Sequence, residues 1–140
     1  MSNSQQHPGD VYSHRRANLA ALKLRYPAQF VGPMISCSWP NGWHLLVAEA
    51  CAHAAHHRAR WDQIKEKLGG LTLHVMPIDD GEDVQLAAWL TKIESRSLQT
   101  CSLCGAEGAR LHDIGGWLLT ACRSCVPLIA AHRSLPRVVR

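Results

Sequence analysis

TCSLCGAEGARLHDIGGWLLTACRSC, residues 100–125, carries the clearest structural signal in this chain. It contains two Cys-x-x-Cys pairs, Cys101 with Cys104 and Cys122 with Cys125, and 17 residues separate the pairs. Two residues between cysteines let one tight turn present both sulfurs to the same metal ion, and Gly105 supplies backbone freedom for such a turn. Four cysteines at these spacings are typical of a zinc site. We therefore predict that they bind one structural zinc ion.

The residues between the two pairs predict a β-hairpin. Residues 109–113 and 117–121 can form short strands joined at residues 114–116. A hairpin returns the chain to its starting point and so carries the second pair back to the first. Residues 126–132 are compatible with a helix in which Pro127 is favourable only in the first turn. We expect a ribbon-like zinc lobe with an appended helix, whereas ligands within the first turn of that helix would make a treble clef.

Three other kinds of site could be formed by the same cysteines: a redox-active dithiol, structural disulfides and an iron–sulfur centre. A redox-active dithiol of the thioredoxin type belongs in a strand-to-helix turn of a larger α/β domain, and that pattern is missing here. Structural disulfides require an oxidising compartment. An iron–sulfur centre has the same ligand count, so residue type alone does not exclude it. In a closed four-thiolate zinc site no coordination position is open to water or substrate, and we expect the ion to stabilise the fold rather than to catalyse.

Upstream of the cysteines, the hydrophobic periodicity predicts two helices in the first half of the chain. The first covers residues 13–26, with Ser13 as its N-cap, Leu19 and Leu22 on its apolar face, and Pro27 after its end. A second helix begins at Asn41 after a connector. Its apolar face carries Trp43, Leu46, Val47, Ala50, Cys51 and Ala54.

The segment after the second helix has two interpretations. The helix continues to a stop at Gly69 and Gly70, or it ends near Arg58 and residues 61–67 pair with residues 71–76 through the diglycine. The alternation of apolar and polar residues over 71–76 favours a strand in both cases.

A third helix is predicted over residues 82–98, just before the first cysteine pair. Asp80 can cap it, and Leu86, Leu90 and Ile93 form its core stripe. The acidic residues at 79–83 lack the spacing of a calcium loop and read as a solvated turn.

The composition fits one small globular protein. The chain has 140 residues with 46% hydrophobic content, which suits a small core with a stapled lobe. It has no apolar run of roughly 18 residues, and residues 1–10 lack the apolar stretch of a secretory signal, so we expect no membrane span and a cytoplasmic protein. The fold class predicted is α+β, with a disordered tail over residues 1–12, a helical α+β core over residues 13–99, and a zinc lobe with a C-terminal helix over residues 100–140.

Two further groups could carry chemistry. His53, His56 and His57 lie close together, but Ala54 stands where a metalloprotease helix has glutamate, so we interpret them as a polar helix face. Cys51 reads as a small core residue. Cys37 is formally available as a nucleophile, yet no convincing catalytic set surrounds it. We therefore predict that the protein is not an enzyme.

The charge distribution points to a partner. The formal charge of +4 is modest, and it is not that of an obligate DNA-binding tail. Basic residues nevertheless gather near the cysteines. The residues that we predict to contact a partner are Trp117, Arg110, Arg123, Lys65 and Lys67.

Three blocks occur in the order QIKEKLGGL (residues 63–71), TCSLCG (residues 100–105) and GWLLTAC (residues 116–122). In these blocks the chain resembles an uncharacterised group of small zinc-ribbon proteins of phages and prophage-like elements. The resemblance implies an accessory factor that acts on host machinery such as a defence complex. We therefore expect a protein that binds, and could inhibit, a host protein or ribonucleoprotein complex. The alternative is a zinc-ribbon regulator that binds nucleic acid.

Overall fold

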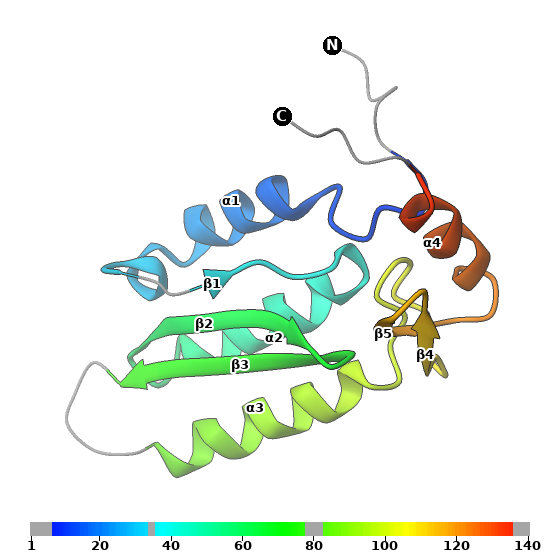
Figure 1. The fold of residues 1–140 in the computed structure, drawn as a ribbon. Coiled ribbons are helices and arrows are strands. Elements are labelled where there is room, and N and C mark those ends of the chain that lie inside the picture. The colour runs from blue at the N-terminus through cyan, green and yellow to red at the C-terminus, as the bar shows by residue number, and fades with distance from the viewer. Residues whose placement is uncertain (1–6, 34–35, 78–82, 136–140) are drawn as a thin grey trace.

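The computed structural model describes residues 7–33, 36–77 and 83–135, and it confirms the α+β class. A three-stranded sheet has the order β1-β2-β3, and a separate two-stranded sheet consists of β4 and β5. Figure 1 shows α3 alongside β3, and the β4–β5 hairpin with α4 on the side of the molecule where α3 ends. The elements are α1 (Arg15–Arg25), η2 (Pro27–Phe30), β1 (Ser36–Cys37), η3 (Asn41–Trp43), α2 (His44–Ala54), β2 (Ala59–Lys67), β3 (Gly70–Pro77), α3 (Val84–Ser97), β4 (Arg110–Ile114), β5 (Trp117–Ala121) and α4 (Val126–Arg133).

Of the two interpretations of the middle segment, the hairpin is correct. Helix α2 ends at Ala54, Arg58 has a left-handed φ of 49°, and β2 begins directly afterwards. The turn uses Leu68 and Gly69, whose φ values are 53° and 86°, so both central residues are left-handed as in a type I′ turn. Gly70 already pairs with the last residue of β2. The turn is therefore shifted by one residue from the predicted diglycine.

Strand β1 was not predicted. It has two residues and pairs parallel to β2, with Ser36 opposite Gln63 and Cys37 opposite Ile64. Two residues carry no alternation pattern, and a parallel partner distant in sequence leaves no local turn signal.

The main core lies between the three-stranded sheet and the helices, and it contains the predicted apolar faces of α2 and α3. Its buried polar group is satisfied internally. Gln29 donates from its amide nitrogen to the Cys51 carbonyl at 2.8 Å and accepts from the Trp61 indole N–H at 2.9 Å. Burying this amide is tolerable because both ends of it are paired.

Helix α3 closes the free edge of β3. The backbone N–H groups of Leu71 and Leu73 donate to the Ser97 hydroxyl and to a Glu94 carboxylate oxygen, each at 2.8 Å. An open edge would otherwise offer these donors to another chain. The predicted N-cap Asp80 lies outside the described residues. In the structure Asp83 caps α3, accepting from the Leu86 N–H at 2.9 Å.

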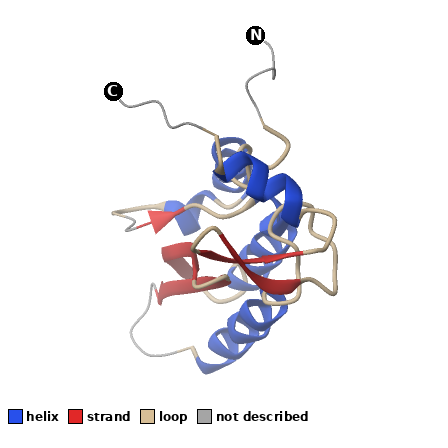
Figure 2. Ribbon diagram, turned by 45° about the vertical axis from the view of Figure 1, so that its right-hand side comes forward, coloured by secondary structure: helices blue, strands red, loops and turns tan. Residues whose placement is uncertain are grey.

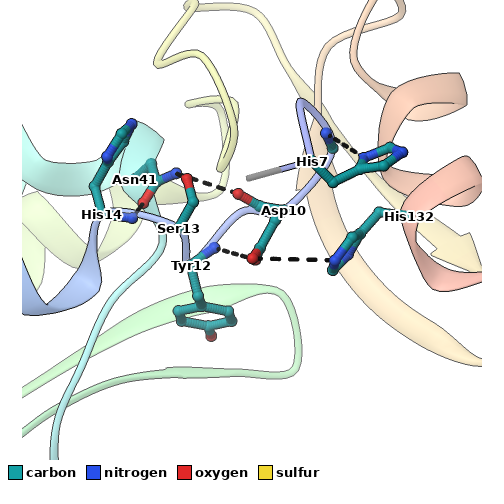
Figure 3. A network of polar contacts seen from close by, with 8 residues as sticks. His7, Asp10, Tyr12, Ser13, His14, Asn41 and His132 are labelled. Atoms are coloured by element: carbon teal, nitrogen blue, oxygen red, sulfur yellow. Dashed lines mark hydrogen bonds and ion pairs between the residues drawn. The ribbon is translucent and has the colours of Figure 1, made fainter. Parts of the chain in front are cut away.

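The prediction of a disordered tail is wrong for residues 7–12. Val11 is 1% exposed and belongs to the hydrophobic cluster of the cysteine region. Asn41 holds this segment: its backbone N–H donates to the Val11 carbonyl at 2.6 Å and its amide donates to the Asp10 carbonyl and to the Ser13 hydroxyl (Figure 3). Ser13 therefore does not cap α1, which begins at Arg15 without a side-chain cap. We call residues 100–135, with this attached segment, the cysteine lobe.

No helix among the described residues is long and apolar enough to cross a membrane.

Candidate metal centre

The first cysteine pair lies in a tight turn after α3. The Gly105 N–H donates to the Cys101 carbonyl at 2.9 Å, and the Cys101 N–H donates to the Ala106 carbonyl at 2.8 Å. Gly105 has a φ of 81°, a left-handed conformation that glycine adopts at little cost. The turn therefore presents Cys101 and Cys104 on the same side, as predicted from their spacing.

The second pair lies between β5 and α4. The N–H groups of Cys125 and Val126 both donate to the Cys122 carbonyl, and Cys125 is the N-cap residue of α4. The last ligand therefore stands at a helix N-terminus, where the helix dipole favours a thiolate. Both cysteines precede α4, which begins at Val126, so the arrangement is the predicted ribbon with an appended helix: a cysteine turn, a hairpin, and a helix that begins directly after the last cysteine. Figure 2 shows the β4–β5 hairpin and helix α4 as one unit beside the larger sheet.

The four sulfurs converge on one point. All of them lie within 4.8 Å of one another, and the Cys104 and Cys122 sulfurs are 3.8 Å apart. Four sulfurs around a central Zn²⁺ at about 2.3 Å form a tetrahedron with edges of about 3.8 Å, whereas a disulfide requires about 2.05 Å. The geometry is therefore that of four ligands of one ion, and these cysteines can hold a metal ion.

The thiols are unequally exposed. Cys101 is 0% and Cys125 6% exposed, whereas Cys122 is half-buried and Cys104 is exposed. Burial raises the pKa of Cys104, and burial together with the neighbouring sulfurs raises the pKa of Cys125. Partial burial opposes ionisation of Cys122 as well, but hydrogen bonds from Cys125 and Cys104 outweigh it and lower the pKa of Cys122 to about 7. One thiolate is thus stabilised at the expense of the others, and ionising all four requires a cation among them.

The cysteine turn is fixed to the main core by the 3₁₀ helix η3. The Gly42 N–H donates to the Ser102 carbonyl at 2.7 Å, and the Trp43 indole N–H donates to the Thr100 carbonyl at 2.8 Å. A Cβ on Gly42 would lie 2.0 Å from the Cys101 carbonyl oxygen. Only glycine fits this close approach, so the metal centre and the N-terminal half of the chain are packed as one unit.

A second attachment joins the cysteine lobe to the β2–β3 turn. The Thr120 hydroxyl donates to the Gly69 carbonyl at 2.7 Å in a buried position, and a Cβ on Gly69 would lie 2.2 Å from Leu111. Glu66 accepts from the Trp117 indole N–H at 3.2 Å. The segments at residues 63–71 and 116–122 therefore meet at this interface.

Trp117, one of the predicted partner residues, is half-buried and has intramolecular contacts. Its ring stacks on Tyr12 with a centroid distance of 6.4 Å, and the Arg133 guanidinium lies 5.0 Å from the ring centroid. Burial is the main cause that raises the pKa of Tyr12 to about 12. The local sequence places Trp117 at a turn, but it does not predict the contact with Tyr12, which is 105 residues away in the chain.

The other predicted partner residues divide into two groups. Arg110 and Arg123 are both exposed and line one groove beside Cys122, with a volume of about 490 Å³. Lys65 and Lys67 lie on β2 and line no part of it. His112 was not among the predicted partner residues; it follows Arg110 by two positions on β4, lies on the same face of the strand and lines the same groove.

The histidines of the α2 region are separate from the metal centre. His53 stacks on Trp89 at 4.2 Å, and His57 pairs with Asp83 at 2.6 Å. Within the described residues, the four cysteines are the one group whose ligand atoms could hold an ion. Cys51 is fully buried as predicted, and burial raises its pKa to about 12.

Comparisons of this chain with protein-family models, with curated proteins and with solved structures gave no match.

Proposed function

We propose that this protein binds another macromolecule through a surface held in place by a structural zinc ion, and that it is not an enzyme. The observation that carries the proposal is the closed donor set: four protein sulfurs lie close enough together to bind one ion, and four sulfur ligands would leave no position for substrate. Two of these sulfurs belong to buried residues in the small hydrophobic cluster of the cysteine lobe. Removing the ion would therefore leave these sulfurs inside that cluster without the cation that they bind.

Zinc is the ion that suits this site best. Thiolates are soft ligands, and Zn²⁺ accepts tetrahedral coordination without a further geometric preference. A cluster of several iron and sulfide ions would hold its cysteine sulfurs farther apart than one ion does. Elemental analysis with an absorption spectrum tests the assignment, because one colourless zinc per chain is expected and a coloured iron protein would contradict it.

The proposed partner is a host protein or ribonucleoprotein, and the protein would act as an accessory factor of phage or mobile-element origin. This rests on the resemblance of the three sequence blocks, together with the exposed Arg110 and Arg123 beside the metal centre. Affinity purification from host lysate tests it, with the double variant Arg110→Ala/Arg123→Ala compared with Lys23→Ala/Arg25→Ala. The second pair lies at the end of α1, on another part of the surface (Figure 1). Partners retained equally by both variants would contradict a role for the groove.

Nucleic-acid binding is the second candidate function. The observation that favours it is the convergence of Arg110, His112 and Arg123 in a groove with no carboxylate in its lining. Binding through phosphates predicts an affinity that falls steeply with salt, because counterions are released. Undetectable or salt-independent binding to DNA and RNA would remove this candidate.

A further inference from the structure

The groove beside the metal centre has walls from two elements. Strand β4 supplies Arg110 and His112, which lie on one face of the strand about 7 Å apart. The start of α4 supplies Val126 and Pro127, and Ala121 and Cys122 complete the lining with Arg123 and Gly108. The register places Arg110 opposite Ala121 and His112 opposite Leu119, both of which are buried. The groove is therefore the outer margin of the hairpin face on which α4 packs.

No acidic side chain among the described residues pairs with the two arginines of the groove. Among the described residues neither Arg110 nor Arg123 forms an ion pair or a hydrogen bond through its side chain. Asp113 follows His112 by one residue on β4 and therefore lies on the opposite face of the strand, and it accepts from the Gly116 N–H at the hairpin turn. Concave sites lined by charge of one sign attract ligands of the opposite sign. The expected ligand is therefore an anion.

The remaining lining selects among anions. Val126 and Pro127 add apolar surface to the same lining, so we expect a ligand that fills the groove to have an apolar group as well as negative charge. Proteins that bind single-stranded nucleic acid usually offer aromatic side chains on which bases stack. No aromatic ring other than the His112 imidazole lines the groove, and the nearby Trp117 ring is held by Tyr12 and Arg133.

We propose that this groove binds an acidic peptide segment of a partner protein, in which carboxylates meet Arg110, His112 and Arg123 and an apolar side chain meets Val126 and Pro127. This inference rests on the proposed binding function and names the chemistry of its partner. Arginine suits the role because its guanidinium can donate two parallel hydrogen bonds to one carboxylate.

The metal centre offers a competing use for the arginines. Four thiolates around a divalent cation carry a net charge of −2, and nearby cations stabilise such a site. Neither arginine side chain donates a hydrogen bond to a cysteine sulfur in the part of the chain described. The two roles differ in outcome: a role in the metal centre affects zinc retention, whereas a role in the groove affects ligand affinity.

The experiment uses the full-length zinc-loaded protein and a fluorescein-labelled peptide, EDLEDLED, with its uncharged analogue QNLQNLQN as the matched ligand. Fluorescence anisotropy measures affinity, and chemical-shift mapping locates the peptide. The inference expects the uncharged peptide to bind at least tenfold more weakly, with shifts centred on Arg110, His112 and Val126. Arg110→Ala/Arg123→Ala should weaken binding of the acidic peptide at least tenfold with full zinc content, and Lys23→Ala/Arg25→Ala should change it less than twofold.

Several results would overturn the inference. They are equal affinity for the two peptides, shifts located elsewhere, tighter binding of a dT oligonucleotide in competition, and loss of zinc from the groove variant. If the peptide does not bind while a host protein still co-purifies with the wild-type chain, this inference alone fails. If no host protein co-purifies either, the proposed function fails with it.

Discussion

Thr120→Val tests whether the cysteine lobe is coupled to the rest of the chain through the β2–β3 turn. Thr120 is 0% exposed, and its hydroxyl donates to the Gly69 carbonyl at 2.7 Å across this interface. Valine keeps the shape of threonine but removes the donor, which leaves a buried carbonyl without its partner at a cost of about 2 kcal/mol. At an unfolding entropy of about 2.1 cal/mol/K per residue, this cost lowers the Tm of the 140-residue chain by about 7 °C.

The assay is thermal and urea unfolding with excess zinc present, so that metal loss does not dominate the transition. Thr91→Val is the matched control: the Thr91 hydroxyl donates to the Ala87 carbonyl within α3 at 2.9 Å and is exposed to water. The control should therefore change the free energy of unfolding by less than about 0.5 kcal/mol. Equal effects of the two substitutions would refute the interpretation of the Thr120 contact as a structural coupling.

Three further predictions concern other contacts. Gly42→Ala should destabilise the protein by more than about 3 kcal/mol and impair zinc retention, because its Cβ would lie 2.0 Å from the Cys101 carbonyl oxygen. Gly108→Ala is the control: its Cβ meets nothing within 4 Å, so the left-handed φ should cost only about 1 kcal/mol. A similar loss of stability in both variants would contradict the steric argument. Gln29→Leu should cost about 3 kcal/mol in urea unfolding, because Trp61 and Cys51 both lose buried hydrogen bonds; a stability equal to wild type would disprove it. Hydrogen bonding from the Leu86 N–H, with a smaller contribution from His57, lowers the pKa of Asp83. The ionised Asp83 carboxylate therefore stabilises the folded protein above about pH 4, and this stabilisation is lost as pH falls through the lowered pKa. The stability difference between wild type and Asp83→Asn should shrink below pH 4, and a constant difference down to pH 2 would argue against this role of Asp83.

The sequence predicted the local features well. The Cys-x-x-Cys spacing, the hairpin between the pairs and the apolar faces of α2 and α3 all depend on residues close together in the chain. The strands follow a hydrophobic repeat of two residues, the helices a repeat of about 3.6 residues, and the cysteine pairs a fixed ligand spacing. For residues 55–76 the local pattern allowed two structures, a longer helix or a hairpin, and the hairpin was one of the two.

Contacts between distant segments could not be predicted in this way. Val11 is buried by a lobe that begins 90 residues later, and Tyr12 covers the ring of Trp117. Ser13 is a good N-cap by residue type, yet the amide of Asn41 engages its hydroxyl instead. His112 gained significance only when the fold placed Arg123 beside it. Local sequence patterns do not show which distant residue will pair with a given side chain.

Metal content measured together with folding tests whether the four cysteines bind a structural zinc ion. The full-length protein, purified under reducing conditions from zinc-supplemented medium, should contain one zinc per chain, and titration with a chelator should unfold the cysteine lobe as the metal leaves. Cys101→Ser/Cys125→Ser removes the two buried ligands and should abolish both the zinc and the lobe's native circular dichroism. A metal-free protein in which the four clustered thiols are titratable and the folded spectrum is unchanged would contradict a structural zinc ion.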